Sequence, residues 1–161
     1  MQLALGALAI ALSLGAASAC GEPEPLPPPP ALDPTELDFA PRLAVDLASM
    51  TRTASGLYVK DVYLGGGREA RPGRSLTVHY TGWLHDGTLF DSSVERDEPL
   101  ELVLGESSLI QGWHEGLEGM REGSRRKLVI PPHLAYGPEG AGGRIPPQAT
   151  LVFSVELLDV R

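Results

Sequence analysis

The chain has 161 residues, enough for one ordinary domain with additional segments. Its formal net charge of −8 arises from 21 acidic and 13 basic residues, without the basic excess typical of nucleic-acid-binding proteins. One cysteine, Cys20, excludes an intrachain disulfide framework and a cysteine-based zinc site. We therefore expect no nucleic-acid partner, and the position of Cys20 is more informative than the count.

The first 19 residues carry no charge and are similar to a signal peptide. The apolar stretch 3–14 has the length of a signal-peptide core and is shorter than the roughly 20 residues of a membrane span. Small residues at 17–19 form a signal-peptidase pattern, and Cys20 follows directly. The arrangement resembles a bacterial lipoprotein signal, although no lysine or arginine precedes the apolar stretch. We expect cleavage after residues 1–19 and lipidation of Cys20; ordinary secretion is the alternative.

A proline-rich segment, 20–34, follows the expected cleavage site. Proline has no N–H to donate and does not continue a helix, so this segment should be an extended, solvated tether. A ligand for an SH3-like module is the rival interpretation. With lipid on Cys20, the protein would be extracytoplasmic, in the periplasm or cell envelope, and anchored in a membrane. A lead-in segment, 35–55, connects the tether to the remaining chain.

The lead-in segment has a weak helical pattern. Leu43, Leu47 and Met50 recur at helical spacing, and Asp33 or Thr35 could cap a short helix. Such a helix could pack on the domain that follows. Alternatively, the segment could be an ordered connection without one.

Residues 56–161 have the pattern of short strands separated by glycine and proline turns. Leu76, Val78 and Tyr80 alternate with polar residues, which is typical of a strand with one buried face. An Asp-Gly pair after this strand predicts a hairpin turn. The expected strands cover residues 57–64, 75–84, 88–90, 100–104, 125–130 and 150–160.

One helix is predicted, over 108–120. Its apolar face comprises Leu109, Ile110, Trp113, Leu117 and Met120. Ser108 and Gln111 fit a capping box. Each of the three glycines in this segment costs about 1 kcal/mol relative to alanine, so packing against a sheet must hold the helix. One short helix with an antiparallel sheet predicts an α+β domain.

Several motifs in 56–161 resemble the signature of FKBP-type peptidyl-prolyl cis-trans isomerases. They are VHYTG at 78–82, FDSS at 90–93, IQGW at 110–113, AYG at 135–137, IPP at 145–147 and ATLVF at 149–153. Any one fragment is a weak signal, but together they keep the order and spacing of the family. The resemblance implies a twisted antiparallel β-sheet wrapped around one short α-helix.

The resemblance also implies a pocket that holds a proline ring. The residues implied as catalytic are Tyr80, Phe90, Asp91 and Tyr136. Those implied as substrate-binding are Leu100, Leu109, Ile110, Trp113, Ile145 and Phe153. Trp113 would form the floor, and the Ile110 amide and Tyr136 hydroxyl would bind substrate carbonyls. Asp91 would lie at the edge, near the rotating bond.

Four rim positions depart from the commonest family pattern, namely Leu100, Ser108, Ala141 and Arg144. They bear on ligand affinity and sequence preference more than on the activity. The implied partners are proline-containing polypeptides and macrolide inhibitors of the FK506/rapamycin type, bound by a monomer.

The implied reaction needs no cofactor, metal or nucleophile, because rotation about an X–Pro bond breaks no covalent bond. His79 and His85 lack a third ligand at matching spacing, and we expect His79 to face solvent. Two other function classes stay open. The pocket could bind proline-containing segments without turnover, or the domain could contact a host or envelope partner. Taken without the family pattern, the aromatic residues would be ordinary core residues.

Overall fold

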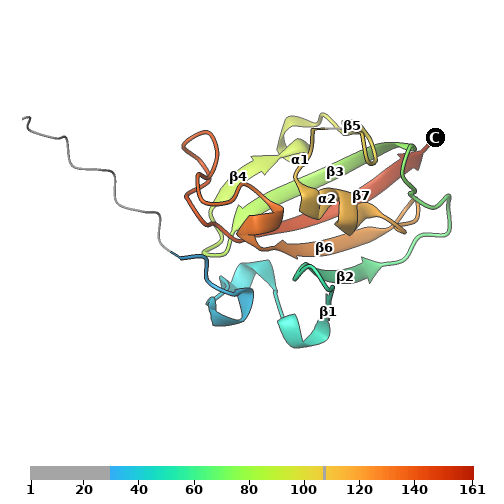
Figure 1. The fold of residues 1–161 in the computed structure, drawn as a ribbon. Coiled ribbons are helices and arrows are strands. Elements are labelled where there is room, and N and C mark those ends of the chain that lie inside the picture. The colour runs from blue at the N-terminus through green and yellow to red at the C-terminus, as the bar shows by residue number, and fades with distance from the viewer. Residues whose placement is uncertain (1–29, 107) are drawn as a thin grey trace, which may run out of the picture.

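A computed structural model describes residues 30–106 and 108–161. The expected signal peptide 1–19, Cys20 and most of the tether lie outside the described residues. No helix in the described ranges is long and apolar enough to span a membrane. Figure 1 shows these residues arranged as an antiparallel sheet with a short helix against one face.

The predicted α+β class, with an antiparallel sheet, is confirmed. Its hydrogen-bonded order is β1-β2-β6-β7-β3-β4, and β5 also pairs with β3. The strands are β1 (Thr51–Arg52), β2 (Tyr58–Tyr63), β3 (Ser75–Leu84), β4 (Leu89–Ser92), β5 (Leu100–Val103), β6 (Arg125–Ile130) and β7 (Leu151–Val160). All predicted strands form, with ends that shift by up to two residues, and β1 is an addition.

The long central strands β3 and β7 divide their side chains between the two faces of the sheet. Burial alternates along β3, as predicted, with every second residue from Leu76 to Leu84 buried. Tyr80 from β3 and Phe153 from β7 join the main core with Trp113. Because successive strand residues point to opposite faces, Tyr80 and Phe153 lie on one side of the sheet, whereas Trp83 packs against the cluster on the other side.

The main helix, α2 (Gln111–Leu117), is shorter than the predicted 108–120. Ile110 is its N-cap and has extended backbone, and no side chain caps the helix, so the predicted Ser108–Gln111 capping box is wrong. The helix ends at Leu117 because the next residue, Glu118, leaves the helical conformation with a ψ of 135°, and Gly119 follows with a left-handed φ of 75°. A four-residue helix, α1 (Ser93–Arg96), was not predicted.

The helix glycines permit close packing of α2 on β6. A Cβ at Gly116 would lie 2.7 Å from Cδ1 of Leu128, and a Cβ at Gly112 would overlap the side chain of Ile130. Leu128 and Ile130 have no solvent exposure. Tertiary packing therefore offsets the low helix propensity of glycine, as expected from the sequence.

The lead-in segment forms three 3-10 turns, η1 (Pro34–Glu36), η2 (Pro41–Leu43) and η3 (Leu47–Ser49), in place of one helix. Ala44, with a φ of 46°, separates the second turn from the third. Figure 1 shows this segment along the side of the sheet near β1 and β2. A second core cluster forms there from Leu43, Met50, Tyr58, Val129 and Val152. The segment therefore packs on the sheet face opposite α2.

The segment between β6 and β7 contains one short turn, η4 (Pro132–Leu134). The remaining residues up to Thr150 in this glycine- and proline-rich segment are irregular. Two backbone hydrogen bonds join Ala141 and Ile145 and close a small hairpin inside it. Arg144 lies in that hairpin, next to the cavity described below.

Candidate functional site

A cavity of about 140 Å³ opens between the sheet, the start of α2 and the segment after β6. Its lining residues are Tyr80, Phe90, Asp91, Leu100, Ser108, Leu109, Ile110, Trp113, Tyr136 and Phe153. Nine of the ten residues proposed from the sequence are therefore brought together. Ile145 does not line the cavity and is buried in the main core, with 8% exposure.

Four aromatic rings form the interior of the cavity. The ring of Trp113 meets those of Tyr80 and Phe153 edge to face, with centroids 5.1 and 5.4 Å apart. Phe90 meets Phe153 in the same way at 5.5 Å. Such perpendicular pairs hold each ring in a defined orientation. The result is a rigid apolar recess of the size of a small ring.

Gly82 on β3 allows two of these rings to approach the sheet. A Cβ at this position would lie 2.6 Å from Cζ of Phe90 and 2.7 Å from Cε1 of Phe153. Any larger residue would therefore displace one of the rings or the strand. The glycine in the VHYTG motif thus has a steric role beside the cavity.

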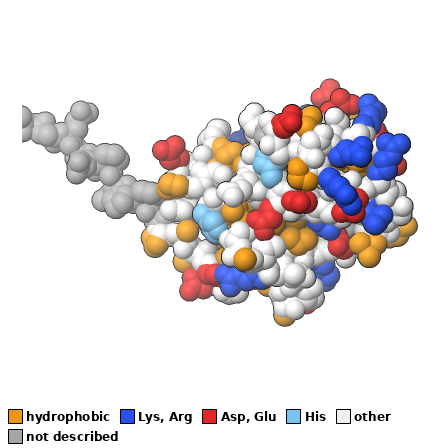
Figure 2. Space-filling model, turned by 45° about the vertical axis from the view of Figure 1, so that its right-hand side comes forward, with side chains coloured by type: hydrophobic (Ala, Val, Ile, Leu, Met, Phe, Trp, Pro, Cys, Tyr) orange, Lys and Arg blue, Asp and Glu red, His pale blue; other side chains and the backbone are white. Residues whose placement is uncertain are grey.

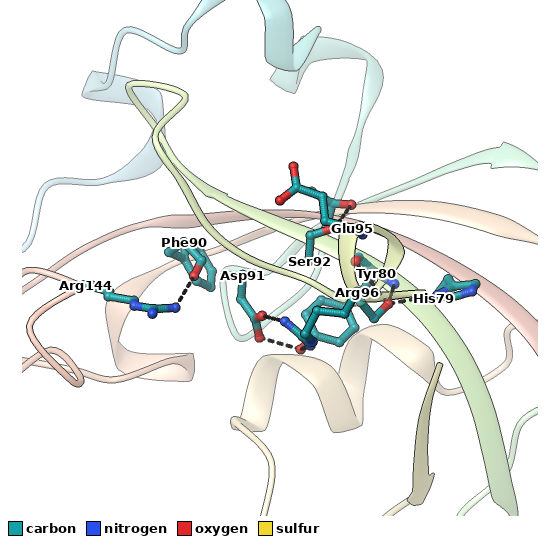
Figure 3. A network of polar contacts seen from close by, with 10 residues as sticks. His79, Tyr80, Phe90, Asp91, Ser92, Glu95, Arg96 and Arg144 are labelled. Carbon is teal, nitrogen blue, oxygen red and sulfur yellow. Dashed lines mark hydrogen bonds and ion pairs between the residues drawn. The ribbon is translucent and has the colours of Figure 1, made fainter. Parts of the chain in front are cut away.

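A polar network forms one edge of the cavity. The Tyr80 hydroxyl donates to Oδ2 of Asp91, and Nη1 of Arg96 donates to Oδ1 of the same carboxylate. A second nitrogen of Arg96 lies 3.3 Å from the Tyr80 hydroxyl, which closes a triangle (Figure 3). Arg96 was not among the residues expected from the sequence. Arg96 lies five residues after Asp91, and this spacing indicates an ion pair only when the short helix α1 is known.

The network shifts the pKa values of its members. Burial alone would raise the pKa of Asp91, but hydrogen bonds from Tyr80 and Arg96 outweigh burial and lower it below 3.8. Burial raises the pKa of the Tyr80 hydroxyl, and its hydrogen bond to Asp91 raises it further. Asp91 is therefore an anchored, ionised carboxylate at neutral pH, and Tyr80 keeps its proton.

Two serines after Asp91 hold β4 and α1 in place. Ser92 caps α1 by accepting from the Glu95 N–H at 3.2 Å. Ser93 is fully buried and accepts from the Tyr80 N–H at 2.8 Å. Nδ1 of His79 lies 3.0 Å from the Ser93 hydroxyl, so His79 is partly buried and hydrogen-bonded, contrary to expectation.

Two polar groups at the cavity have no protein partner within the described residues. They are the hydroxyl of Tyr136, whose residue is 42% exposed, and the backbone N–H of Ile110. Burial raises the pKa of the Tyr136 hydroxyl, and the charge of Asp91 raises it further. At neutral pH the hydroxyl is therefore a proton donor that is available to a ligand.

The described residues contain no cluster of three or more histidine, cysteine, aspartate or glutamate side chains that could hold a metal ion. The indole nitrogen of Trp113 is buried without a hydrogen-bond partner among them. The cavity thus offers an apolar floor and a few donors. Such an arrangement can bind a small ring and the carbonyl groups beside it.

An antiparallel sheet around one short helix, with an aromatic cavity between them, defines the class of FKBP-like folds. The family model for FKBP-type peptidyl-prolyl cis-trans isomerases matches residues 66–158. The chain therefore belongs to this family of peptidyl-prolyl cis-trans isomerases.

Similar proteins share both the sequence and the fold. An FK506-binding protein of Neisseria meningitidis serogroup B is 56% identical over 105 residues, which span 65% of this chain and 96% of the relative. The crystal structure of FkpA from Escherichia coli has a TM-score of 0.67 at 43% identity, covering 75% of this chain and 55% of that one. The crystal structure of AtFKBP13 has a TM-score of 0.65 at 38% identity, covering 70% and 98%.

Proposed function

We propose that the chain accelerates rotation about X–Pro bonds in proteins that fold outside the cytoplasm, by binding the twisted amide in the aromatic cavity. One observation carries this proposal. The apolar recess formed by Tyr80, Phe90, Trp113 and Phe153 lies beside two donors, the Tyr136 hydroxyl and the Ile110 N–H, that have no partner among the described residues.

The physical problem in this reaction is loss of amide resonance. The barrier to rotation is about 18–20 kcal/mol, and uncatalysed X–Pro exchange takes tens to hundreds of seconds. A twisted amide has less charge separation than a planar one, so it loses less when water is removed. A water-excluding aromatic recess therefore favours the transition state over either planar form.

Each part of the cavity has a proposed role. The proline ring packs on Trp113, with Tyr80, Phe90 and Phe153 as walls. The Ile110 N–H and the Tyr136 hydroxyl donate to substrate carbonyls and hold the flanking backbone in a bent conformation. Leu100 and Leu109 contact the substrate side chains next to the proline. Ile145 supports the segment over the cavity from the core.

Asp91 takes the edge position near the rotating bond. Arg96 and Tyr80 already satisfy its carboxylate, so it does not move when a substrate binds. A fixed negative group at this position orients the dipole of the approaching amide without reorganisation. This role requires Asp91 to be ionised, and its lowered pKa supports that state.

We further propose that the protein is a monomer with two ligand classes. Proline-containing polypeptides are the substrates, and macrolides of the FK506 type are competing ligands. The relative from Neisseria is named for FK506 binding. Leu100 lines this cavity and Arg144 lies beside it, so these two residues would set the affinity for such macrolides.

The proposed location rests on the sequence at 17–20. Signal-peptide cleavage before Cys20 and lipidation of that cysteine would anchor the chain in a membrane of the cell envelope, with the proline-rich segment 20–34 as a tether before the lead-in 35–55 and the isomerase domain 56–161. Replacement of Cys20 by Ser would prevent lipid attachment. Mass spectrometry of the mature N-terminus, beside membrane fractionation, tests this. An unmodified cysteine in a soluble fraction would refute the anchor.

The isomerase proposal is tested by exchange spectroscopy. Cis–trans exchange of an Ala-Leu-Pro-Phe peptide is followed by NMR with the full chain and with a Tyr136→Phe, Asp91→Ala double variant. We expect exchange far above the uncatalysed rate with the parent and a clear loss with the variant. A parent that binds the peptide but leaves the exchange rate at background would reduce the function to binding.

A further inference from the structure

Arg144 lies beside the aromatic cavity and reaches across to β4. Its Nη1 donates to the carbonyl oxygen of Phe90 at 3.4 Å, although the two residues are 54 positions apart. Figure 3 shows Arg144 on one side of Phe90 and Asp91, with Arg96 on the other side. Phe90 and Asp91 both line the cavity. The guanidinium of Arg144 thus lies next to the cavity wall that Phe90 and Asp91 form.

The backbone around Arg144 is well defined. The Arg144 N–H donates to the Ala141 carbonyl at 3.1 Å, and two further bonds of 3.0 Å join Ala141 and Ile145. Gly142 and Gly143, with φ values of 54° and 68°, provide the left-handed turn. Ile145 anchors the hairpin in the core. The position of Arg144 is therefore set before any substrate binds, which lowers the entropic cost of a contact.

The charge of Arg144 has no ion-pair partner among the described residues. Among the described residues, no carboxylate lies within 4.0 Å of its guanidinium, whereas Asp91 is taken by Arg96. Glu139, in the same segment, makes no ion pair with it either. On the face drawn in Figure 2, most Lys and Arg side chains are interspersed with Asp and Glu. Several arginines elsewhere in the described residues do form ion pairs, such as Arg125 with Glu156 at 2.9 Å.

We propose that Arg144 selects proline-containing segments that carry an acidic residue within two positions of the proline. This inference rests on the isomerase function proposed above. The Cα of a residue at that distance along an extended chain would lie within about 7 Å of the proline Cα, so its carboxylate would be within reach of the Arg144 side chain. The guanidinium can then donate two parallel hydrogen bonds to it. Arg144 is exposed, so we expect a preference of about two- to fivefold, reduced by salt.

The test compares peptides that differ only in charge. Peptides of the form Ala-Xaa-Leu-Pro-Phe-Ala and Ala-Leu-Pro-Phe-Xaa-Ala carry Glu, Gln or Lys at Xaa, and NMR exchange gives kcat/KM for each with the full chain. We expect at least one series to run in the order Glu, Gln, Lys, with a Glu-to-Gln ratio of about two to five that falls towards one in 0.5 M salt. Equal values for Glu and Lys in both series would overturn the proposal.

Variants separate charge from structure. Arg144→Gln should bring the Glu-to-Gln ratio to one, Arg144→Glu should reverse the preference towards Lys, and Arg144→Lys should retain the original preference. Arg74→Gln, an exposed arginine before β3, is the matched control and should leave the ratio unchanged. A ratio in Arg144→Glu equal to that of the parent would refute the role of Arg144.

This proposal and the isomerase function fail in different ways. If the Gln peptides are turned over but charge has no effect, the selection by Arg144 is wrong and the isomerase function stands. If no peptide is turned over, the isomerase function is wrong. Peptide dissociation constants from NMR titration then give the same Glu-to-Lys comparison and decide the role of Arg144 on binding alone.

Discussion

The ammonium group of Lys127 on β6 donates a hydrogen bond to the main-chain carbonyl of Leu43, 84 residues earlier in the chain. It also donates to the carbonyl of Ala44 at 3.2 Å. Burial lowers the pKa of Lys127, and the charge of Lys60 lowers it further. These bonds fix the turn that places Leu43 in the second core cluster, which also contains Val152. The lead-in segment is therefore an integral cover for one face of the sheet.

Removal of the Leu43 side chain should destabilise the fold. Leu43 is 4% exposed, and we expect Leu43→Ala to lower the free energy of unfolding by about 2–3 kcal/mol. Leu32→Ala is the control, because Leu32 is 50% exposed, and should change it by less than about 0.5 kcal/mol. Urea unfolding measures both. Similar midpoints for the two variants would mean that the lead-in contributes nothing to stability.

A methyl group at Gly116 should also destabilise the protein, although alanine is the better helix former. The added Cβ would lie 2.7 Å from Leu128, and overpacking of this kind costs about 1–3 kcal/mol, against a propensity gain of about 1 kcal/mol. Gly66→Ala is the control, since a Cβ there would meet nothing within 4 Å. Urea unfolding of both variants measures the difference. An increase in stability for Gly116→Ala would show that the helix can move away from the sheet.

Much of the fold could be predicted from local pattern. Alternation in β3 and β7 defines a buried face, and turn residues separate the strands, so the sheet follows from residue chemistry. The end of α2 was less predictable. Leu109 and Met120 continue the apolar periodicity, but Ile110 is extended and Gly119 is left-handed, and periodicity does not report backbone conformation. The lead-in failed as a helix because Pro41 and the left-handed Ala44 interrupt the pattern.

The residues of the site could be predicted only where they belong to motifs of the family. The resemblance placed nine of its residues because their motifs keep family spacing, whereas composition alone would have left them in the core. Arg96 was missed because its partner Tyr80 lies 16 residues away on another element. The same applies to the contact between Arg144 and Phe90. Long-range polar contacts depend on how β4 and its neighbours pack, which a linear pattern does not contain.

Arg96 should keep the carboxylate of Asp91 ionised in acid. The pKa of Asp91 in the folded protein lies below 3.8. Its favourable contribution to the free energy of unfolding is therefore present above about pH 3.8 and is lost as the pH falls through the pKa of the folded state. Arg96→Ala removes one donor, so the pKa of Asp91 should rise. A carbon-13 NMR titration of the carboxyl groups measures this, with Arg74→Ala as the control. An unchanged pKa would mean that Tyr80 alone holds the carboxylate.

The isomerase activity should be nearly independent of pH. Burial raises the pKa values of Tyr80 and Tyr136 above 10.0, and Asp91 titrates below 3.8. No cavity residue therefore changes its charge between about pH 5 and 9, and kcat/KM should be flat across that range. The profile is measured with a peptide that has no titrating group. A bell-shaped profile would indicate a proton-transfer step that the cavity does not provide.

Gly82 should be more important for activity than for folding. In Gly82→Ala the new methyl group would lie 2.6 Å from Phe90 and 2.7 Å from Phe153, so at least one wall of the cavity must shift. Rearrangement of this kind costs about 1–3 kcal/mol. If the whole cost weakens substrate binding, kcat/KM should fall by about fivefold to a hundredfold. NMR exchange measures the loss, and urea unfolding shows the fraction folded under the same conditions. Gly66→Ala should retain full activity. If Gly82→Ala matched that control, the rings would have room to adjust, and a fixed aromatic recess would not be the basis of catalysis.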